Sequence, residues 1–308
     1  MPDKQGPDPI RRSAQELGNA SEPGMSHEEF RAIRDLIRDR SGLAFPDDAR
    51  YAFDRRLRER IGELGLSGFP EYYRVLRQDV AGDGEMQEVY DLLITRETYF
   101  FREEYQLRGF RDEVLPVLTS AETRHKQITI WSAGCSTGEE AYSIAMVLLE
   151  AGTQGHKARV HGTDLSRRNV AIARKGLYSD SAFRSTSEER KRRFFVERDD
   201  CLQVCEPLRS MCQFGTLNLL EMDRAPRFMQ LDVIFCKNVL IYFDSVARRR
   251  VISGFHDRLR PGGYLFLGHS ESLLNEPGPF EHVHLASDVV YRKPAHPTVP
   301  PANRRRAR

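Results

Sequence analysis

Between residues 25 and 90, apolar residues recur every three or four positions, which is the spacing of helices that bury one face. Ser26, followed by two glutamates, is a candidate N-cap for the first helix, and Ser41-Gly42 is its candidate end. Three further helices are predicted to begin near residues 47, 69 and 86. The pattern therefore predicts an all-helical N-terminal domain over residues 25–90.

The periodicity changes after a predicted linker and helix at residues 91–125. From residue 126 to 293, short β-branched segments alternate with helical ones. The predicted strands are residues 128–131, 158–163, 231–236 and 264–267, and the predicted helices are residues 139–151, 166–175 and 245–259. Alternation of this kind predicts a parallel sheet with helices on both faces, so the fold class is α/β.

One stretch, residues 185–214, breaks the alternation. Cys201–Cys205 and Leu208–Phe214 are predicted to form two antiparallel strands around a turn that contains Pro207. We interpret this stretch as a small β-subdomain inserted into the α/β domain.

The composition favours a two-domain globular chain. The chain has 308 residues, of which 40% are hydrophobic and 30% charged. No apolar run approaches the roughly 20 residues of a membrane-spanning helix, and the first residues lack the apolar core of a secretory signal. We therefore expect a cytoplasmic protein without membrane insertion. Residues 1–24 and the basic residues 294–308 are predicted to be disordered tails.

Charge and cysteine content narrow the set of partners. The 47 basic and 45 acidic residues nearly cancel, so no nucleic-acid partner is expected. The five cysteines form no CxxC pair, which predicts reduced thiols and no metal site. A monomer is the default expectation.

A strand, a turn of small residues and a helix N-terminus follow one another at residues 128–140. Gly134 and Gly138 allow the turn to approach a ligand, and Asp164, at the end of the next predicted strand, can accept both hydroxyls of a ribose. The turn lacks GxGxxG, and Glu139 and Glu140 stand where a pyrophosphate would lie. Two carboxylates repel a phosphate but can accept an ammonium or a hydroxyl. This favours S-adenosylmethionine over NAD, although both glutamates can also simply complement the helix dipole.

A Pro-Gly-Gly turn at residues 261–263 follows a predicted helix and enters a predicted strand, as is typical of class I methyltransferases. Four longer segments, taken in their order along the chain, point to one family. The segments are Thr98–Glu103, Trp131–Ser143, Asp232–Asp244 and Gly262–Glu271. Over about residues 25–293 the chain resembles the chemotaxis-receptor glutamate methyltransferases, the CheR family. The resemblance implies a helical N-terminal domain, a linker, and a class I (Rossmann-like) S-adenosylmethionine-dependent methyltransferase domain with a small antiparallel β-subdomain.

The resemblance also implies a reaction and a site. The reaction transfers a methyl group from S-adenosylmethionine, giving S-adenosylhomocysteine, to glutamate side chains in chemoreceptor cytoplasmic helices. Arg102 and Tyr242 are the implied catalytic residues, with Arg102 holding the acceptor carboxylate and Tyr242 facing the methyl group. Glu139 or Glu140 is implied to contact the cofactor, and the pattern alone does not decide between them. The other implied cofactor residues are Thr98, Arg102, Gly134, Asp164, Asn218, Leu219, Cys236, Lys237 and Asn238.

The implied partner is an acidic helical bundle of a chemoreceptor, which a cationic helix face would steer. The candidates are Arg50, Arg55, Arg56 and Arg58, although acidic residues interleave with them and the same side chains can form a solvated face. Some family members dock a receptor C-terminal pentapeptide on a glycine-rich loop of the β-subdomain. Residues 197–209 contain no glycine, so pentapeptide-independent action is expected.

Two other functions stay open. One alternative is a methyltransferase for a different acceptor, such as a small acid or another signalling protein. The other is a non-catalytic adaptor that keeps the fold. The basic helical domain favours a protein acceptor, and the presence of Arg102 and Tyr242 favours an enzyme. An NAD-dependent oxidoreductase is disfavoured because the turn after the first strand lacks GxGxxG and carries two glutamates.

Overall fold

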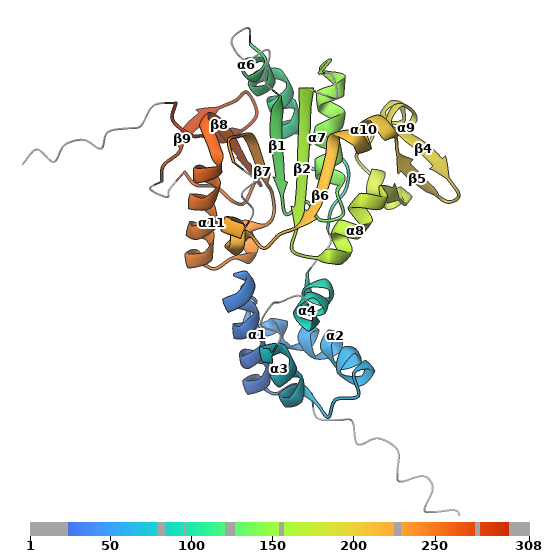
Figure 1. Ribbon diagram of the computed structural model, residues 1–308, viewed down its shortest axis with the longest axis vertical. Coiled ribbons are helices and arrows are strands. Elements are labelled where there is room, and N and C mark those ends of the chain that lie inside the picture. The colour runs from blue at the N-terminus through green and yellow to red at the C-terminus, as the bar shows by residue number, and fades with distance from the viewer. Residues whose placement is uncertain are drawn as a thin grey trace, which may run out of the picture.

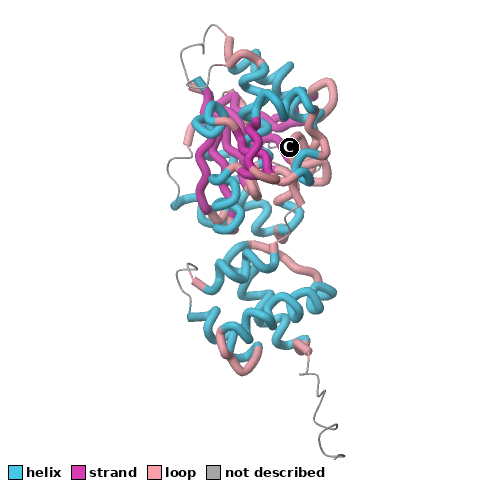
Figure 2. The backbone as a smooth tube through the Cα atoms, turned by 90° about the vertical axis from the view of Figure 1, so that its right-hand side faces the viewer, coloured by secondary structure: helices cyan, strands magenta, loops and turns pink. Residues whose placement is uncertain are grey.

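The computed structural model describes residues 24–78, 84–94, 97–120, 127–153, 157–224, 229–274 and 278–295. A helical N-terminal part is stacked against a larger part built around a sheet (Figures 1 and 2). The predicted disordered tails, residues 1–24 and 294–308, lie outside the described residues except for residues 24, 294 and 295. Within the described ranges, no helix is long and apolar enough to cross a bilayer.

The N-terminal part consists of four α-helices. They are α1 (His27–Ser41), α2 (Arg50–Glu63), α3 (Phe69–Gln78) and α4 (Glu85–Leu93), with a 3-10 turn at Asp47–Ala49 before α2. Ser26 and Glu29 form a reciprocal capping box at the start of α1, and Gly42 ends this helix with a φ of 77°. The apolar sides of the helices meet in one core around Phe30, Phe53 and Tyr72. The four helices predicted from periodicity are therefore present.

The larger part contains a seven-stranded sheet in the order β6-β2-β1-β7-β8-β10-β9. The strands are β1 (Ile128–Ala133), β2 (Ala158–Asp164), β6 (Cys212–Thr216), β7 (Leu231–Cys236), β8 (Leu259–Leu267), β9 (Glu281–His284) and β10 (Val289–Arg292). The first five strands in the spatial order are parallel, and β10 and β9 add antiparallel pairs. Successive strand residues such as Ile130 and Trp131 enter separate apolar clusters, because neighbouring side chains point to opposite faces.

Helices cover both faces of this sheet, as the alternating pattern predicts. One apolar cluster joins the strands to α5 (Glu104–Gly109), a π-helical turn (Phe110–Val114), α6 (Leu115–Leu118) and α7 (Glu139–Glu150). The other joins them to a 3-10 segment (Leu219–Arg224) and α11 (Ser245–Arg258). Between β2 and β7 the chain also forms α8 (Arg167–Lys175), α9 (Glu188–Phe194) and α10 (Glu206–Met211).

The predicted β-subdomain at residues 185–214 is partly wrong. Its first strand exists as β5 (Cys201–Val204), which pairs antiparallel with β4 (Phe195–Arg198) and β3 (Leu177–Tyr178). The second predicted strand is instead α10 followed by β6, and β6 joins the large sheet parallel to β2. Pro207 lies in the first turn of α10, where proline favours a helix, and Leu208 and Met211 bury the same helix face. The small sheet therefore spans residues 177–204.

Candidate active site

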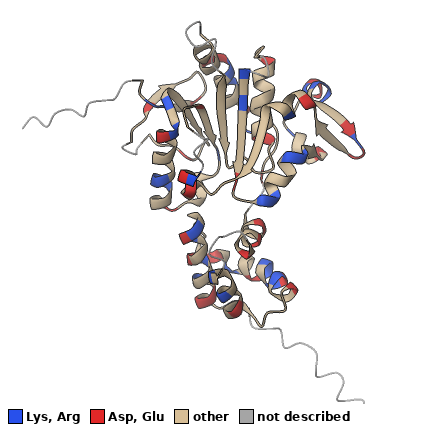
Figure 3. Cartoon of the chain, viewed as in Figure 1, with Lys and Arg blue, Asp and Glu red and all other residues tan. Residues whose placement is uncertain are grey.

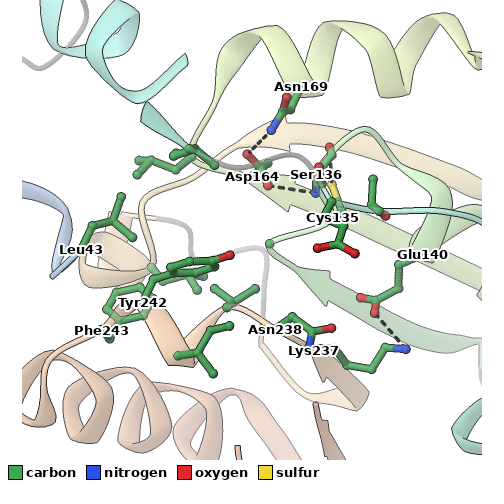
Figure 4. A pocket seen from close by; sticks show the side chains of 18 of the residues that line it. Leu43, Cys135, Ser136, Glu140, Asp164, Asn169, Lys237, Asn238, Tyr242 and Phe243 are labelled. Carbon is green, nitrogen blue, oxygen red and sulfur yellow. Dashed lines mark hydrogen bonds and ion pairs between the residues drawn. The ribbon is translucent and has the colours of Figure 1, made fainter. Parts of the chain in front are cut away.

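A cavity lies between the helical part and the carboxyl ends of the parallel strands. It is lined by residues of the α1–α2 connection and of α4, and by the turns that follow β1, β2, β6 and β7. In Figure 4, Leu43 and Tyr242 lie on one side of the cavity, and Ser136 and Glu140 lie on the other. The chain runs from β1 outward to β2 and later returns to β7 on the other side of β1. The cavity therefore occupies a topological switch point, where open α/β sheets bind ligands.

The turn after β1 approaches its neighbours so closely that two glycines are required. A Cβ on Gly134 would lie 2.4 Å from Cγ2 of Val239, and one on Gly138 would lie 2.8 Å from Cβ of Ala173. Both glycines also have positive φ, 83° and 100°. The amide nitrogen of Gly134 donates a 2.7 Å hydrogen bond to the carbonyl oxygen of Thr163, which fastens this turn to the end of β2.

Asp164 stands at the end of β2 with both carboxylate oxygens held by the protein. Oδ2 accepts from the amide nitrogen of Ser136 at 2.9 Å. Oδ1 accepts from the amide nitrogen of Ser166 at 2.9 Å and from Nδ2 of Asn169 at 3.2 Å. Burial raises the pKa of Asp164, and these hydrogen bonds act in the opposite direction. The carboxylate is thus fixed in place and lines the cavity, where it can accept hydroxyl donors from a ligand.

The two neighbouring glutamates of α7 have different surroundings. Glu140 lines the cavity: its Oε1 accepts from Oγ of Ser132 at 2.7 Å, and its Oε2 lies 3.5 Å from Nζ of Lys237. Glu139 is not among the lining residues and accepts a 2.7 Å hydrogen bond from Oγ1 of Thr137. Burial raises the pKa of both, that of Glu139 to about 7. Glu140 is therefore the glutamate that can face a ligand ammonium.

Lys237 connects this wall of the cavity to the segment that carries Arg102. Its Nζ donates to the carbonyl oxygen of Arg102 at 3.0 Å and lies 3.8 Å from Oε2 of Glu103. Lys237 and Asn238 line the cavity, whereas Cys236 is fully buried in the core beneath it and is not a lining residue. The structure thus brings two of these three predicted residues to the cavity.

Thr98, Arg102 and Tyr242 all line the cavity. Nη1 of Arg102 donates to the carbonyl oxygen of Glu97 at 2.5 Å. Tyr242 is 39% exposed, and its phenol ring points into the cavity in Figure 4. Its carbonyl oxygen accepts a 2.7 Å hydrogen bond from the amide nitrogen of Ala44, so the turn after β7 is joined to the helical part.

Asn218 and Leu219, which the resemblance implies as cofactor residues beside the adenine, also line the cavity. Nδ2 of Asn218 donates to the carbonyl oxygen of Arg40 at 2.7 Å, and its Oδ1 accepts from the amide nitrogen of Leu220 at 3.0 Å. The first bond holds the segment after β6 against the end of α1, and the second fixes the side chain of Asn218 within that segment.

The four arginines of α2 lie outside the cavity lining, and three of them have local partners. Arg50 donates to the carbonyl oxygen of Met25, and Arg56 donates to the carbonyl oxygens of Leu92 and Leu93. Arg58 pairs with Asp54 at 2.6 Å, whereas Arg55 is exposed. Arg50 and Arg56 therefore hold the helical part together, and Arg55 is the member of the set most open to a partner.

Two residues with a place in the site were missed from the sequence. Asn169 lines the cavity, is buried, and has an Oδ1 without a hydrogen-bond partner among the described residues. Glu271 is fully buried and binds the turn that carries Asn238. The signal for Asn169 is its place three residues after the N-cap Ser166. Glu271 carries no comparable signal, because its partners come from two turns that are far apart in the sequence.

Comparison with known proteins gives two family matches. The CheR methyltransferase all-alpha domain matches residues 28–94, and the CheR methyltransferase SAM binding domain matches residues 96–289. Chemotaxis protein methyltransferase 2 of Vibrio cholerae is 34% identical, over 86% of this chain and 93% of its own length. Chemotaxis protein methyltransferase 1 of Pseudomonas aeruginosa is 33% identical, over 86% and 97%. The chemotaxis protein methyltransferase of Escherichia coli is 33% identical, over 80% and 85%.

The two matches together cover nearly the whole described chain, and the boundary between them falls where the helical part ends. The cavity lies where these two matched regions meet. The chain belongs to the CheR methyltransferase family and is an S-adenosylmethionine-dependent methyltransferase.

Proposed function

We propose that this enzyme methylates the side-chain carboxylate of specific glutamates in chemoreceptor cytoplasmic helices, giving methyl esters for sensory adaptation. The observation that carries the proposal is one cavity with the carboxylates of Glu140 and Asp164 on its inner wall and with Arg102 and Tyr242 also in its lining. Such a cavity separates a region for a cationic amino-acid cofactor from a region for a carboxylate acceptor.

The residues of the inner wall fit S-adenosylmethionine. Glu140 can accept the ammonium of its methionine part, Asp164 the two ribose hydroxyls, and Asn218-Leu219 can border the adenine. Gly134, in the turn after β1, also lines the cavity. The cofactor, when bound, supplies a methyl group on a sulfonium.

The acceptor needs no strong base. A glutamate with a pKa of about 4.3 is already ionised at neutral pH, so the protein's task is to align the carboxylate and exclude water. A guanidinium has five N–H donors, so Arg102 can keep its bond to Glu97 and still hold the non-attacking carboxylate oxygen. A single such contact leaves the other oxygen nucleophilic. Tyr242 packs beside the path of the methyl group.

The acceptor helix is proposed to approach over α2, where basic and acidic positions are both present (Figure 3). Arg55 is the exposed arginine of the predicted set, so Arg55→Glu should slow methylation of an acidic helix several-fold at low salt and leave cofactor binding unchanged. Arg192→Glu is the matched control, because Arg192 is an exposed arginine on a different helix, α9. Equal rates for wild type and Arg55→Glu at low salt would contradict this docking face.

Three further properties belong to the same proposal. Because β4, β5 and their turn lack glycine, docking of a receptor C-terminal pentapeptide is not expected. Action in the cytoplasm follows from acceptors that are cytoplasmic receptor helices. A monomer is proposed as the acting form.

The test is a transfer assay with methyl-labelled S-adenosylmethionine and receptor cytoplasmic fragments from the same source. The labelled product is treated with mild base, and volatile methanol is counted. Base-labile label on the receptor would support a carboxyl methyl ester. If no label appears on the receptor while calorimetry still detects binding of S-adenosylhomocysteine, the proposal is contradicted, and another acceptor or an adaptor role is favoured.

A further inference from the structure

Glu271, four positions beyond the end of β8, is fully buried, and its carboxylate accepts four hydrogen bonds from backbone nitrogens. Oε1 accepts from the amide nitrogens of Val239 at 2.8 Å and Ile241 at 3.1 Å. Oε2 accepts from the amide nitrogens of Asn238 at 2.7 Å and Gly268 at 2.8 Å. One side chain thus joins the turn after β7 to the turn after β8.

The two turns approach each other closely at this point. A Cβ on Gly268 would lie 2.6 Å from Oε2 of Glu271 and 2.8 Å from the amide nitrogen of Asn238, so the approach requires glycine. Asn238 itself has a φ of 59°, a conformation that residues other than glycine adopt infrequently. The hydrogen bond from the backbone amide of Asn238 to Glu271 holds Asn238 in this conformation.

Glu271 is in turn held by α11. Nη2 of Arg248 donates to the carbonyl oxygen of Glu271 at 3.2 Å and to that of Ser272 at 3.0 Å. The turn that Glu271 binds begins directly after Lys237 and ends at Tyr242, so it supplies Asn238, Ile241 and Tyr242 to the cavity. The carboxylate itself is not among the residues that line the cavity.

We propose that Glu271 is a positioning residue for methyl transfer, which fixes the 238–242 turn and thereby the place of Tyr242 in the cavity. The inference rests on the proposed function, because it assumes that Tyr242 acts on the acceptor side. A carboxylate suits this place because it is an acceptor only, with lone pairs for four donors. In Glu271→Gln, either orientation of the amide would direct its NH₂ group at two N–H donors.

Asp232→Asn provides the matched control. Asp232 is also a buried carboxylate that accepts from a backbone nitrogen, that of Thr129 at 2.7 Å, and it pairs with Arg260 at 2.8 Å. It lies at the amino end of β7, whereas the turn bound by Glu271 follows the carboxyl end of the same strand. Both variants lose a buried carboxylate, but only Glu271→Gln loses hydrogen bonds to a turn that lines the cavity.

The first measurement compares kcat at saturating acceptor, the dissociation constant of S-adenosylhomocysteine, and the thermal midpoint for the two variants. Displacement of a reacting group by about 1 Å costs up to about 100-fold, so Glu271→Gln should lower kcat at least about tenfold. Cofactor affinity should fall less than kcat, because Asn238 is the one implied cofactor residue on this turn, whereas Glu140 and Asp164 lie on other segments. Asp232→Asn should lower the thermal midpoint without lowering kcat. Equal kcat losses in both variants would overturn the proposal.

The second measurement is amide hydrogen exchange on the chain alone, which does not depend on any acceptor. Exchange at residues 238, 239, 241 and 268 should accelerate in Glu271→Gln and stay as in wild type in Asp232→Asn. Accelerated exchange with an unchanged kcat would overturn the positioning role, and unchanged exchange would overturn the anchor. If the wild-type chain methylates no receptor fragment, the proposed function is contradicted before any variant is compared. The positioning role is then contradicted as well.

Discussion

Replacement of Glu140 by glutamine tests the cofactor site most directly, because Glu139 beside it provides a control in the same helix turn. Glu140 lines the cavity beside Lys237, whereas Glu139 lies outside the lining with Thr137 as its partner. Both side chains lie in the first turn of α7, and burial raises the pKa of both. Only their direction relative to the cavity separates them.

The charges around Glu140 set the size of the effect. Nζ of Lys237 lies 3.5 Å from Glu140 and 3.8 Å from Glu103, so the three groups together carry one net negative charge. That charge is what a ligand ammonium meets, and Glu140→Gln removes it. A hydrogen bond to a charged group is worth about 1.5–3 kcal/mol, and about 1.4 kcal/mol corresponds to a tenfold change in affinity. Glu140→Gln should therefore weaken S-adenosylhomocysteine binding by roughly 10- to 150-fold.

Calorimetry with two ligands isolates the ammonium. S-adenosylhomocysteine carries the amino-acid group, whereas 5′-methylthioadenosine lacks it and keeps the adenosine. Glu140→Gln should weaken the first ligand and leave the second nearly unchanged. Glu139→Gln should change neither by more than about threefold, because the amide oxygen of glutamine can still accept from the Thr137 hydroxyl. Equal weakening by the two variants, or equal loss for the two ligands, would refute this assignment.

Three other changes test separate parts of the structure. Asp164→Asn should weaken both ligands by about tenfold or more, since both carry the ribose; calorimetry that finds only one ligand weakened would contradict the role of Asp164. Burial raises the pKa of Glu139 to about 7 from an ordinary 4.5. The folded state therefore binds the proton more tightly, and its stability should fall by up to about 3 kcal/mol as pH rises through this window. The free energy of unfolding of Glu139→Gln, measured in urea, should lack this part of the pH dependence. The same pH dependence in wild type and variant would show that Glu139 is not its source. Gly42→Ala would place a Cβ 2.7 Å from Cδ1 of Phe243, whereas Gly65→Ala adds only backbone strain, with no described atom within 4 Å. Both should lower the thermal midpoint, but only Gly42→Ala should lower kcat; equal kcat values would show that this junction does not position the site.

Local signals predicted the helical part and the central strands. The Ser26 cap, the Gly42 end and the apolar spacing between them are all short-range, and the structure has α1 with the same bounds. The strand prediction failed at residues 208–211, where the pattern is compatible with either a strand or a helix, and the antiparallel pairing predicted for residues 212–214 is instead parallel pairing with β2. There the outcome depends on tertiary packing, because Leu208 and Met211 pack into the large core and β6 pairs with β2 far back in the chain.

The sequence predicted which residue types form the site, but not the direction in which each side chain points. The pattern placed a pair of carboxylates at the start of α7, and only packing against Ser132 and Lys237 turns Glu140 to the cavity. Cys236 and Lys237 illustrate the same limit, since adjacent residues at a strand end point to opposite sides. Glu271 was beyond prediction, because its four donors come from two turns separated by a whole helix. Sequence spacing carries no record of such a contact.

The helical part completes the cavity, which gives it a role besides the proposed docking of an acceptor. Nδ2 of Asn218 donates to the carbonyl oxygen of Arg40, and the amide of Ala44 donates to the carbonyl oxygen of Tyr242. Both helical-domain partners belong to the short stretch from the end of α1 to the start of the next turn. A movement of α1 would therefore be transmitted to both sides of the site, to the segment proposed to border adenine and to Tyr242. If an acceptor docks on the helical part as proposed, its binding would be coupled to the alignment of its carboxylate through these two hydrogen bonds.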